Sequence, residues 1–214
     1  MPPSPSPTVF VVDDDAAIRK AVSRLLRSAG FAVAAFASPS EFLAQYNPAM
    51  PGCLVLDIAM PGFSGLRLQT TLGETGSTVP IIFLTGHADV PKSVQAMKYG
   101  AFDFLTKPVD GKDLLAAVRA AIEKDSAARR EQAKRSEIHE RLDTLTPRER
   151  EVLEHVVAGK LNKQIAADLG ITEATVKMHR ARVMTKMKVQ SVAELACLME
   201  RCGIRESNSL KSAA

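Results

Sequence analysis

Polar side chains follow four hydrophobic runs of a kind that forms buried strands. The runs are TVFVV, CLVL, VPIIFL and AFDFL, and continuous apolar runs are typical of parallel strands covered on both faces. Just after them come Asp13 and Asp14, Asp57, Thr85 and Lys107. Because ligands of open α/β sheets bind outside the carboxyl ends of the strands, we expect these side chains to meet at one site. Three acids, a hydroxyl and an ammonium suit a divalent cation and a phosphoryl group.

Strand-like and helix-like patterns alternate from Thr8 to about Ile122, in five pairs. Such alternation predicts a doubly wound, five-stranded parallel sheet. Between the first two strands, apolar residues recur at helical spacing, and Gly30 follows where this helix is expected to end. Another helix is expected from about Asp89 to Tyr99.

Residues 123–143 have many charges and few apolar side chains, without Gly or Pro. This composition predicts a solvated helical linker rather than a flexible coil. A coiled-coil seam is not expected, because only Ile138, Leu142 and Leu145 keep a helical spacing.

Four helices are expected after Leu145. Thr146 with Pro147 and Glu149 predicts an N-cap, a first-turn proline and a capping-box acid at the start of the first. The second and third are joined by the short Leu-Gly-Ile turn at 169–171, which is typical of a helix-turn-helix. The segment SVAELACLMER supplies the fourth.

Charge divides unevenly between the two halves. Residues 1–123 carry 10 Lys and Arg against 11 Asp and Glu, a net of −1, whereas residues 124–214 carry 18 against 13, a net of +5. The basic second half favours an anionic partner.

No apolar stretch approaches the roughly 20 residues that span a bilayer, and the start lacks the regions of a signal peptide. We therefore expect a cytoplasmic protein without a membrane partner, with short disordered tails at 1–7 and 205–214. The three cysteines, Cys53, Cys197 and Cys202, are odd in number and lie in apolar segments. Buried thiols are expected rather than a disulfide or a metal set.

Asp57 is the best candidate nucleophile, because it ends a strand by itself ahead of a tight IAMPG turn. A carboxylate can accept a phosphoryl group as an acyl phosphate, with Lys107 neutralising charge on the transferring group. Taken alone, Asp13–Asp15 could be only a helix N-terminus, and Thr85 or Lys107 only a solvated side chain. Their joint placement at successive strand ends favours a site.

Residues 8–122 resemble the receiver domain of two-component response regulators, in the motifs VVDDD, LVLDIAMPG, FLTGHAD and AFDFLTKP. The resemblance implies a flavodoxin-like fold, Mg²⁺ as cofactor and a sensor histidine kinase as phosphoryl donor. It makes Asp57 the phosphoacceptor. Metal binding is implied for Asp13, Asp14, Asp57 and the backbone carbonyl of Ala59.

The same resemblance implies a switch made of the Thr85 hydroxyl and the Phe104 ring, with Lys107 as phosphoryl partner. It implies a cis bond before Pro108, which is uncommon but available to proline. Ala59 and His87 lie at positions that adjust the lifetime of the acyl phosphate in this family.

Cations are dense on the helix expected over 172–188, where Glu173 is the one acid. Val176, Val183 and Met187 are spaced to face a core. Such a basic face suits DNA phosphates, and the start of a recognition helix suits the major groove. A basic helix face seen alone is usually only solvated, but the turn and the four-helix pattern favour DNA binding.

Residues 144–204 resemble the LuxR-type four-helix DNA-binding domain, in TPRER, NKQIA, LGI and TVKMHR. With the receiver in front, the chain resembles FixJ/NarL-type regulators, closest to the FixJ branch. The resemblance implies promoter DNA and RNA polymerase as partners, and a homodimer on phosphorylation. It places Lys177, Met178 and Ala181 in the groove with Arg180 close by, and Lys163, Thr172, Thr175, Arg182 and Lys186 near the DNA backbone.

Two other hypotheses stay open. The first is an enzyme, a haloacid-dehalogenase-like phosphatase with Asp57 as nucleophile; that family has a second acid two residues later, where this chain has Ala59. The second keeps DNA binding but makes the front domain a phosphate-independent interaction module. The complete set of acids, Thr and Lys argues against it.

Overall fold

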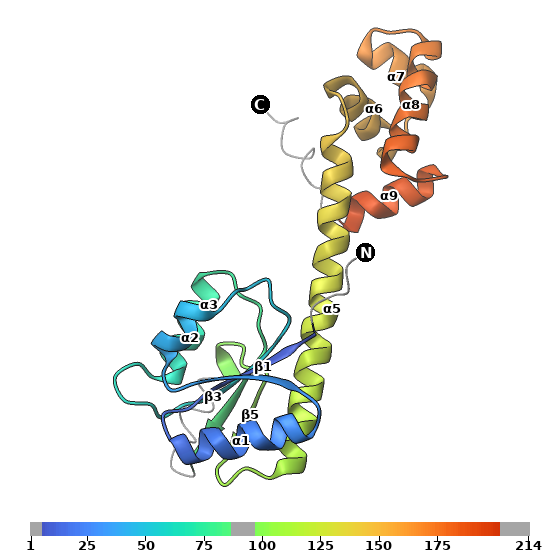
Figure 1. Ribbon diagram of the computed structural model, residues 1–214. Helices are drawn as coiled ribbons and strands as arrows, with labels where there is room; N and C mark the ends of the chain where they lie inside the picture. Colours follow the sequence, from blue (N-terminus) through green and yellow to red (C-terminus); the bar gives the residue numbers. More distant parts are fainter. Residues whose placement is uncertain (1–5, 87–96, 202–214) are drawn as a thin grey trace. The chain divides into compact units, whose positions relative to one another are not determined.

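The computed structural model describes residues 6–86 and 97–201, so most of the helix expected near Asp89 and nearly all of both tails lie outside the described residues. The chain divides into two compact units, Met1–Arg129 and Arg130–Ala214. The first unit contains β1 (Thr8–Val12), α1 (Ala16–Ser28), β2 (Ala32–Phe36), α2 (Pro39–Gln45), β3 (Gly52–Asp57), α3 (Gly65–Glu74), β4 (Ile81–Thr85), β5 (Asp103–Thr106) and the first part of α5 (Gly111–Asp143) (Figure 1).

The five strands form one parallel sheet in the order β2-β1-β3-β4-β5, which confirms the expected doubly wound fold. Every residue of β3 and β4 is buried, because helices cover both faces. Helices α2 and α3 cover one face of the sheet, and α1 and α5 cover the other (Figure 1). Their apolar side chains complete the two core clusters. The carboxyl ends of β1, β3 and β4 therefore lie next to one another.

The helix after β1 begins and ends as the sequence predicts. Asp15 caps it by accepting hydrogen bonds from the backbone N–H of Ala17 at 2.7 Å and of Ile18 at 3.2 Å. After the helix, Gly30 adopts φ 89°, a left-handed conformation that favours glycine. These two devices turn the chain back toward the sheet.

Helix α5 continues to Asp143, so residues 123–143 are helical as expected. They are not solvated throughout, which corrects the sequence prediction. Asp125 is only 1% exposed and Arg129 is half-buried, while Ile138 and Leu142 lie in the core of the second unit. The composition did not indicate these contacts, because a segment with a few buried positions among many charged residues is still polar on average.

The second unit adds α6 (Pro147–Val157), α7 (Asn162–Leu169), α8 (Glu173–Met187) and α9 (Val192–Arg201). All four expected helices are present. The predicted capping box of Thr146 and Glu149 is confirmed, since each side chain accepts from the other residue's backbone N–H. Gly170 ends α7 at φ 63°, as the turn requires.

Val176, Val183 and Met187 are buried, which confirms the predicted core face of α8. The same helix also supplies a cation to the core. Lys186 Nζ lies 2.7 Å from Glu149 Oε2, and Glu149 is 2% exposed. The Lys186 ammonium and the Thr146 backbone hold the pKa of Glu149 at about 2, below its ordinary 4.5.

The cysteines differ from one another. Cys53 is free and buried as expected, and burial, with the nearby Asp125 charge, raises the pKa of its thiol to about 12. Cys197 is free but exposed, which corrects the expectation: Leu195 and Met199 face the core, and a residue midway between them on a helix points away. Cys202 lies outside the described residues. In 6–86 and 97–201, each helix is too short or too polar to cross a membrane.

We expect Glu149→Gln to lower the free energy of unfolding of the second unit by about 2 kcal/mol at pH 7, the scale of a hydrogen bond to a charged group. Glutamine keeps the capping box but loses the charge that pairs with Lys186. Because the folded pKa of Glu149 lies below the unfolded value, its contribution is complete above pH 4.5 and is lost as the pH falls toward 2. The difference in the free energy of unfolding between wild type and Glu149→Gln should therefore disappear as the pH falls from 4.5 toward 2. Urea titrations followed by circular dichroism would measure it.

Glu151→Gln is the matched control, because Glu151 lies on the same helix in an exposed pair with Arg148. Exposed pairs contribute little, so this change should leave stability nearly unaltered. Equal effects of the two substitutions at pH 7 would contradict a special role for the Glu149–Lys186 pair.

Candidate functional site

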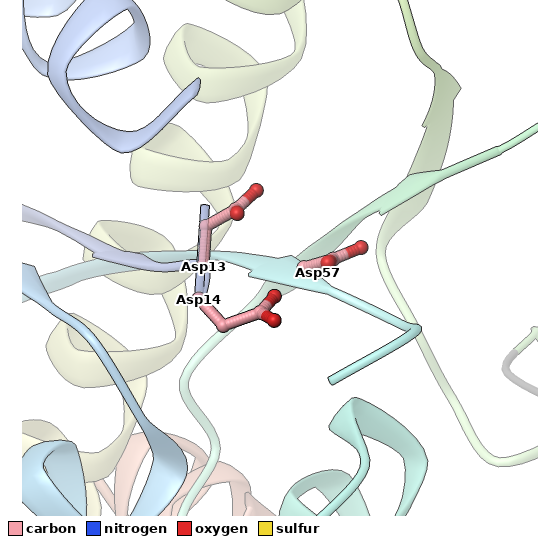
Figure 2. Close-up of side chains that lie close together, drawn as sticks. All are labelled: Asp13, Asp14 and Asp57. Atoms are coloured by element: carbon pink, nitrogen blue, oxygen red, sulfur yellow. The ribbon is translucent and has the colours of Figure 1, made fainter. Parts of the chain in front are cut away.

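Three carboxylates meet at the carboxyl edge of the sheet. Asp57 is the last residue of β3, and Asp13 and Asp14 directly follow β1, the neighbouring strand (Figure 2). Each offers a ligand oxygen, and these oxygens lie within 4.8 Å of one another. Asp13 and Asp57 are buried and Asp14 is exposed, so the cluster opens to solvent on one side. Strand topology brings these predicted residues together.

Lys107 reaches this cluster from the end of β5. Its Nζ lies 2.8 Å from Asp13 Oδ2 and 3.2 Å from Asp57 Oδ1. Burial raises the pKa of the Asp13 carboxyl, and the ammonium offsets this only in part. Burial alone would lower the pKa of Lys107, but the hydrogen bond and charge of Asp13, with Asp57, raise it, so Lys107 stays protonated. The peptide bond before Pro108 is cis, as expected.

The predicted switch residues occupy different surroundings. Thr85 is 2% exposed and donates its hydroxyl hydrogen to the carbonyl oxygen of Gly86 at 3.0 Å. Phe104 is 42% exposed, so its ring is not part of the core here. The backbone N–H of Ala59 donates to Asp57 Oδ1 at 3.3 Å, which fixes one carboxylate oxygen. His87 lies outside the described residues.

One residue that sequence reasoning missed supports the acidic loop. Arg19 donates from its guanidinium to the carbonyl oxygens of Asp13 at 2.6 Å and Asp14 at 3.3 Å. It therefore holds the backbone of both acids through their carbonyl oxygens and does not occupy their carboxylates. The sequence feature that could have indicated this role is the position of Arg19 in the first turn of α1, where the helix dipole disfavours a cation.

The donor set fits a hard divalent cation. Mg²⁺ prefers carboxylate oxygens and keeps several waters, and an open acidic cluster allows both. Lys107 would remain beside Asp57, where it can neutralise a second anionic group. The arrangement thus offers carboxylate oxygens to a cation and an ammonium to an anionic oxygen.

The second candidate surface is the helix pair α7 and α8 with its tight turn. The predicted groove residues Lys177, Met178 and Ala181 are exposed, as is Arg182. Because Val176 and Val183 face the core, these side chains project from the opposite side of α8. Lys163 is exposed on α7. The structure thus presents most of the predicted DNA contacts on solvent-facing positions.

Arg180 is half-buried and donates to Asn162 Oδ1 at 2.6 Å, a contact between α8 and α7 that the sequence pattern did not indicate. The Thr172 hydroxyl caps α8 by accepting from the Thr175 backbone N–H at 3.1 Å, and the two hydroxyls hydrogen-bond at 2.9 Å. Lys186, predicted near the DNA backbone, pairs with the buried Glu149 at 2.7 Å, and its side chain stays 33% exposed. Its contact with the DNA backbone stays a prediction.

The comparisons with known proteins agree with the division of the chain into two units. Residues 9–119 match the response regulator receiver domain, and residues 143–199 match the luxR family of bacterial regulatory proteins. Nodulation protein W of Bradyrhizobium diazoefficiens is 45% identical over 201 residues, which cover 94% of this chain and 88% of that protein.

The transcriptional regulatory protein FixJ of Azorhizobium caulinodans is 46% identical, over 92% of this chain and 93% of that protein. The solved structure of the response regulator StyR matches with a TM-score of 0.86 and 44% identity, covering 92% of this chain and all (100%) of that one.

A doubly wound sheet with acids at its carboxyl edge, followed by a helix-turn-helix unit, defines a phosphorylation-activated transcription regulator. The chain belongs to the response regulators with a LuxR-type DNA-binding domain, of the FixJ-like kind. The resemblance inferred from its motifs is confirmed. The phosphatase hypothesis falls, because the matching family is one of transcription regulators rather than classical enzymes.

Proposed function

We propose that Asp57 accepts the phosphoryl group that activates this regulator. The observation that carries the proposal is the place of its carboxylate, at the end of β3 beside the Asp13 acid and the Lys107 ammonium. An oxygen of Asp57 attacks the phosphorus of a kinase phosphohistidine, forming the O–P bond as the P–N bond breaks, and the imidazole leaves. Hydrolysis of the acyl phosphate by water returns the carboxylate and inorganic phosphate.

The chain's own residues have separate tasks in this step. Lys107 neutralises an oxygen of the incoming group, and the Ala59 N–H orients the carboxylate. A bound Mg²⁺, held by Asp13, Asp14, Asp57 and the Ala59 carbonyl, supplies further charge neutralisation. The only chemistry expected of the chain is this transfer to and from itself.

Incubation with acetyl phosphate and Mg²⁺ should add one phosphoryl group to the wild type and none to Asp57→Asn, as measured by intact mass. Chelation of the metal should abolish the incorporation. Asp15→Asn is the matched control: it changes an adjacent acid whose carboxylate caps α1, and it should still be phosphorylated. Equal incorporation in wild type and Asp57→Asn would rule out Asp57, and no incorporation in the wild type would favour a phosphate-independent front domain.

We further propose that α8 reads promoter DNA. Support comes from the exposed Lys177, Met178 and Ala181 on the side of the helix away from its core. Arg180 lies close by, while Arg182 and Lys163 are exposed and suited to phosphate contacts. Thr172 and Thr175 stand at the start of the helix, where backbone and hydroxyl groups can meet the DNA backbone. Such a protein works in the cytoplasm, where DNA and RNA polymerase are its partners.

Lys177→Ala should weaken binding to a selected promoter duplex about tenfold or more, the scale of one good base contact. Arg182→Ala should weaken specific and scrambled duplexes alike and reduce the salt slope by about one. Titrations by fluorescence anisotropy across salt would measure both. Lys134→Ala, an exposed lysine on α5, is the control and should change neither quantity. Unchanged binding in both Lys177→Ala and Arg182→Ala would exclude α8 as the reader.

Phosphorylation is proposed to promote a two-fold dimer through the receiver face made by the fourth helix, β5 and α5, roughly residues 89–122. Part of that face lies outside the described residues. Its described part exposes three large apolar side chains, Met97, Tyr99 and Phe104. New phosphoryl oxygens would draw the Thr85 hydroxyl away from Gly86, which leaves room for Phe104 to turn inward and changes the face.

The phosphorylated wild type should sediment as a dimer at micromolar concentration and should bind paired half-sites more tightly than single ones. Asp57→Asn treated in the same way is the control and should behave as the unphosphorylated protein. A phosphorylated chain that stays monomeric, without preference for paired sites, would show that activation does not proceed through this dimer.

A further inference from the structure

Two side chains one turn apart on α5 bind the rest of the first unit through several hydrogen bonds. Asp125 Oδ2 accepts from the Gly52 backbone N–H at 2.9 Å and from Arg129 Nε at 2.8 Å. The other guanidinium nitrogens of Arg129 donate to the carbonyl oxygens of Pro48 at 2.9 Å, Ala49 at 3.0 Å and Met50 at 2.7 Å. We call this pair the Asp125–Arg129 clasp.

The clasp attaches to the amino-terminal edge of the sheet. Gly52 begins β3 and pairs there with Thr8 of β1. A Cβ atom at Gly52 would lie 1.8 Å from the Thr8 carbonyl oxygen, so only glycine permits this approach. The backbone that receives the clasp is therefore closely fixed, and so is the part of α5 that carries it.

The strand that begins at the clasp ends at the phosphoacceptor. β3 runs from Gly52 to Asp57 with every residue buried, and its six residues (Gly52–Asp57) span about 17 Å at the usual rise. A fully buried central strand does not deform easily. The clasp thus gives α5 a fixed point at the edge of the sheet opposite the acidic cluster.

Beyond the clasp, α5 has little to hold it. Residues 131–137 are all exposed, and the next buried position is Ile138, in the core of the second unit. A short exposed helical stretch is only marginally stable by itself in water. The clasp also lies between the two regions that match known families, residues 9–119 and 143–199, so neither match assigns it a role.

We propose that the Asp125–Arg129 clasp is a positioning device for signal transfer, and that the gain in DNA affinity on phosphorylation depends on it. The inference rests on the proposed phosphorylation of Asp57. The clasp makes α5 a fixed part of the receiver as far as Arg129, so a rearrangement around Thr85 and Phe104 is passed along the helix. Without it, α5 beyond Ile122 frays or pivots, and the rearrangement is lost within the linker.

The test compares full-length variants in three measurements: phosphorylation by intact mass, affinity for a duplex selected by the wild type, and hydrogen exchange of residues 123–137. Arg129→Ala removes the whole guanidinium and leaves the buried Asp125 without its cation. Arg129→Lys is the sharper variant, because it keeps a charge for Asp125 but cannot donate to three carbonyls from one planar group. Arg135→Ala, which removes an exposed arginine of the same helix, is the matched control.

We expect equal phosphorylation in all variants, because Arg129 lies far from Asp57. The ratio of DNA affinities with and without the phosphoryl group should fall at least about fivefold in Arg129→Ala and Arg129→Lys, the lower range of allosteric couplings, and stay unchanged in Arg135→Ala. Exchange in residues 123–137 should rise in both Arg129 variants. A merely stabilising clasp would lower the melting temperature and leave the affinity ratio of the folded protein unaltered.

If Arg129→Ala fails to fold, Arg129→Lys by itself tests the proposal. A folded Arg129→Lys with the wild-type affinity ratio would overturn the proposal, and so would unchanged exchange in residues 123–137. A wild type whose DNA affinity does not respond to phosphorylation would contradict the proposed function instead. In that case the exchange measurement alone decides whether the clasp fixes the helix.

Discussion

The ammonium of Lys107 is the contact on which the acidic edge of the sheet depends. Asp13 and Asp57 are buried with their oxygens close together, and like charges in such a place repel strongly. Lys107 lies within 3.2 Å of both, so it joins the ends of β1, β3 and β5 and offsets the repulsion between the two carboxylates. The same ammonium that stabilises the acidic cluster also offers a positive charge to an anionic group bound beside it.

Two further buried acids are also paired with a cation, although neither lies at the acidic edge of the sheet. Glu149 is neutralised by Lys186, and Asp125 by Arg129. A buried carboxylate without a partner is strongly unfavourable, so each acid needs a cation from a side chain that can reach it. On α8, this requirement engages Lys186 in an ion pair with an acid of α6.

Helix α5 contributes residues to the cores of both units. Its first turns complete the receiver core, and its last turns carry Ile138 and Leu142 into the core of the second unit. A polar composition is compatible with this, because a helix needs only a few apolar or paired positions to dock. The charged residues in the middle of α5 are exposed to solvent. The buried residues on either side of them pack into the core of the first or of the second unit.

The sequence by itself determined the elements, their order and most of the acidic cluster. Strand runs, caps such as Asp15 and Thr146, and the turn at Gly170 are local patterns, and the structure contains each of them. Asp13, Asp14, Asp57 and Lys107 could be placed together because the ends of adjacent parallel strands must meet.

Only the tertiary structure decided how the charges are paired. Lys107 and Asp13 are 94 residues apart, and Lys186 and Glu149 are 37 apart. Nothing in a local pattern specifies such partners, and a lysine in a basic helix has the same signature whether it faces solvent or a buried acid. The partner is set by which side chains the folded core brings within reach, because a charge excluded from water must be neutralised where it lies.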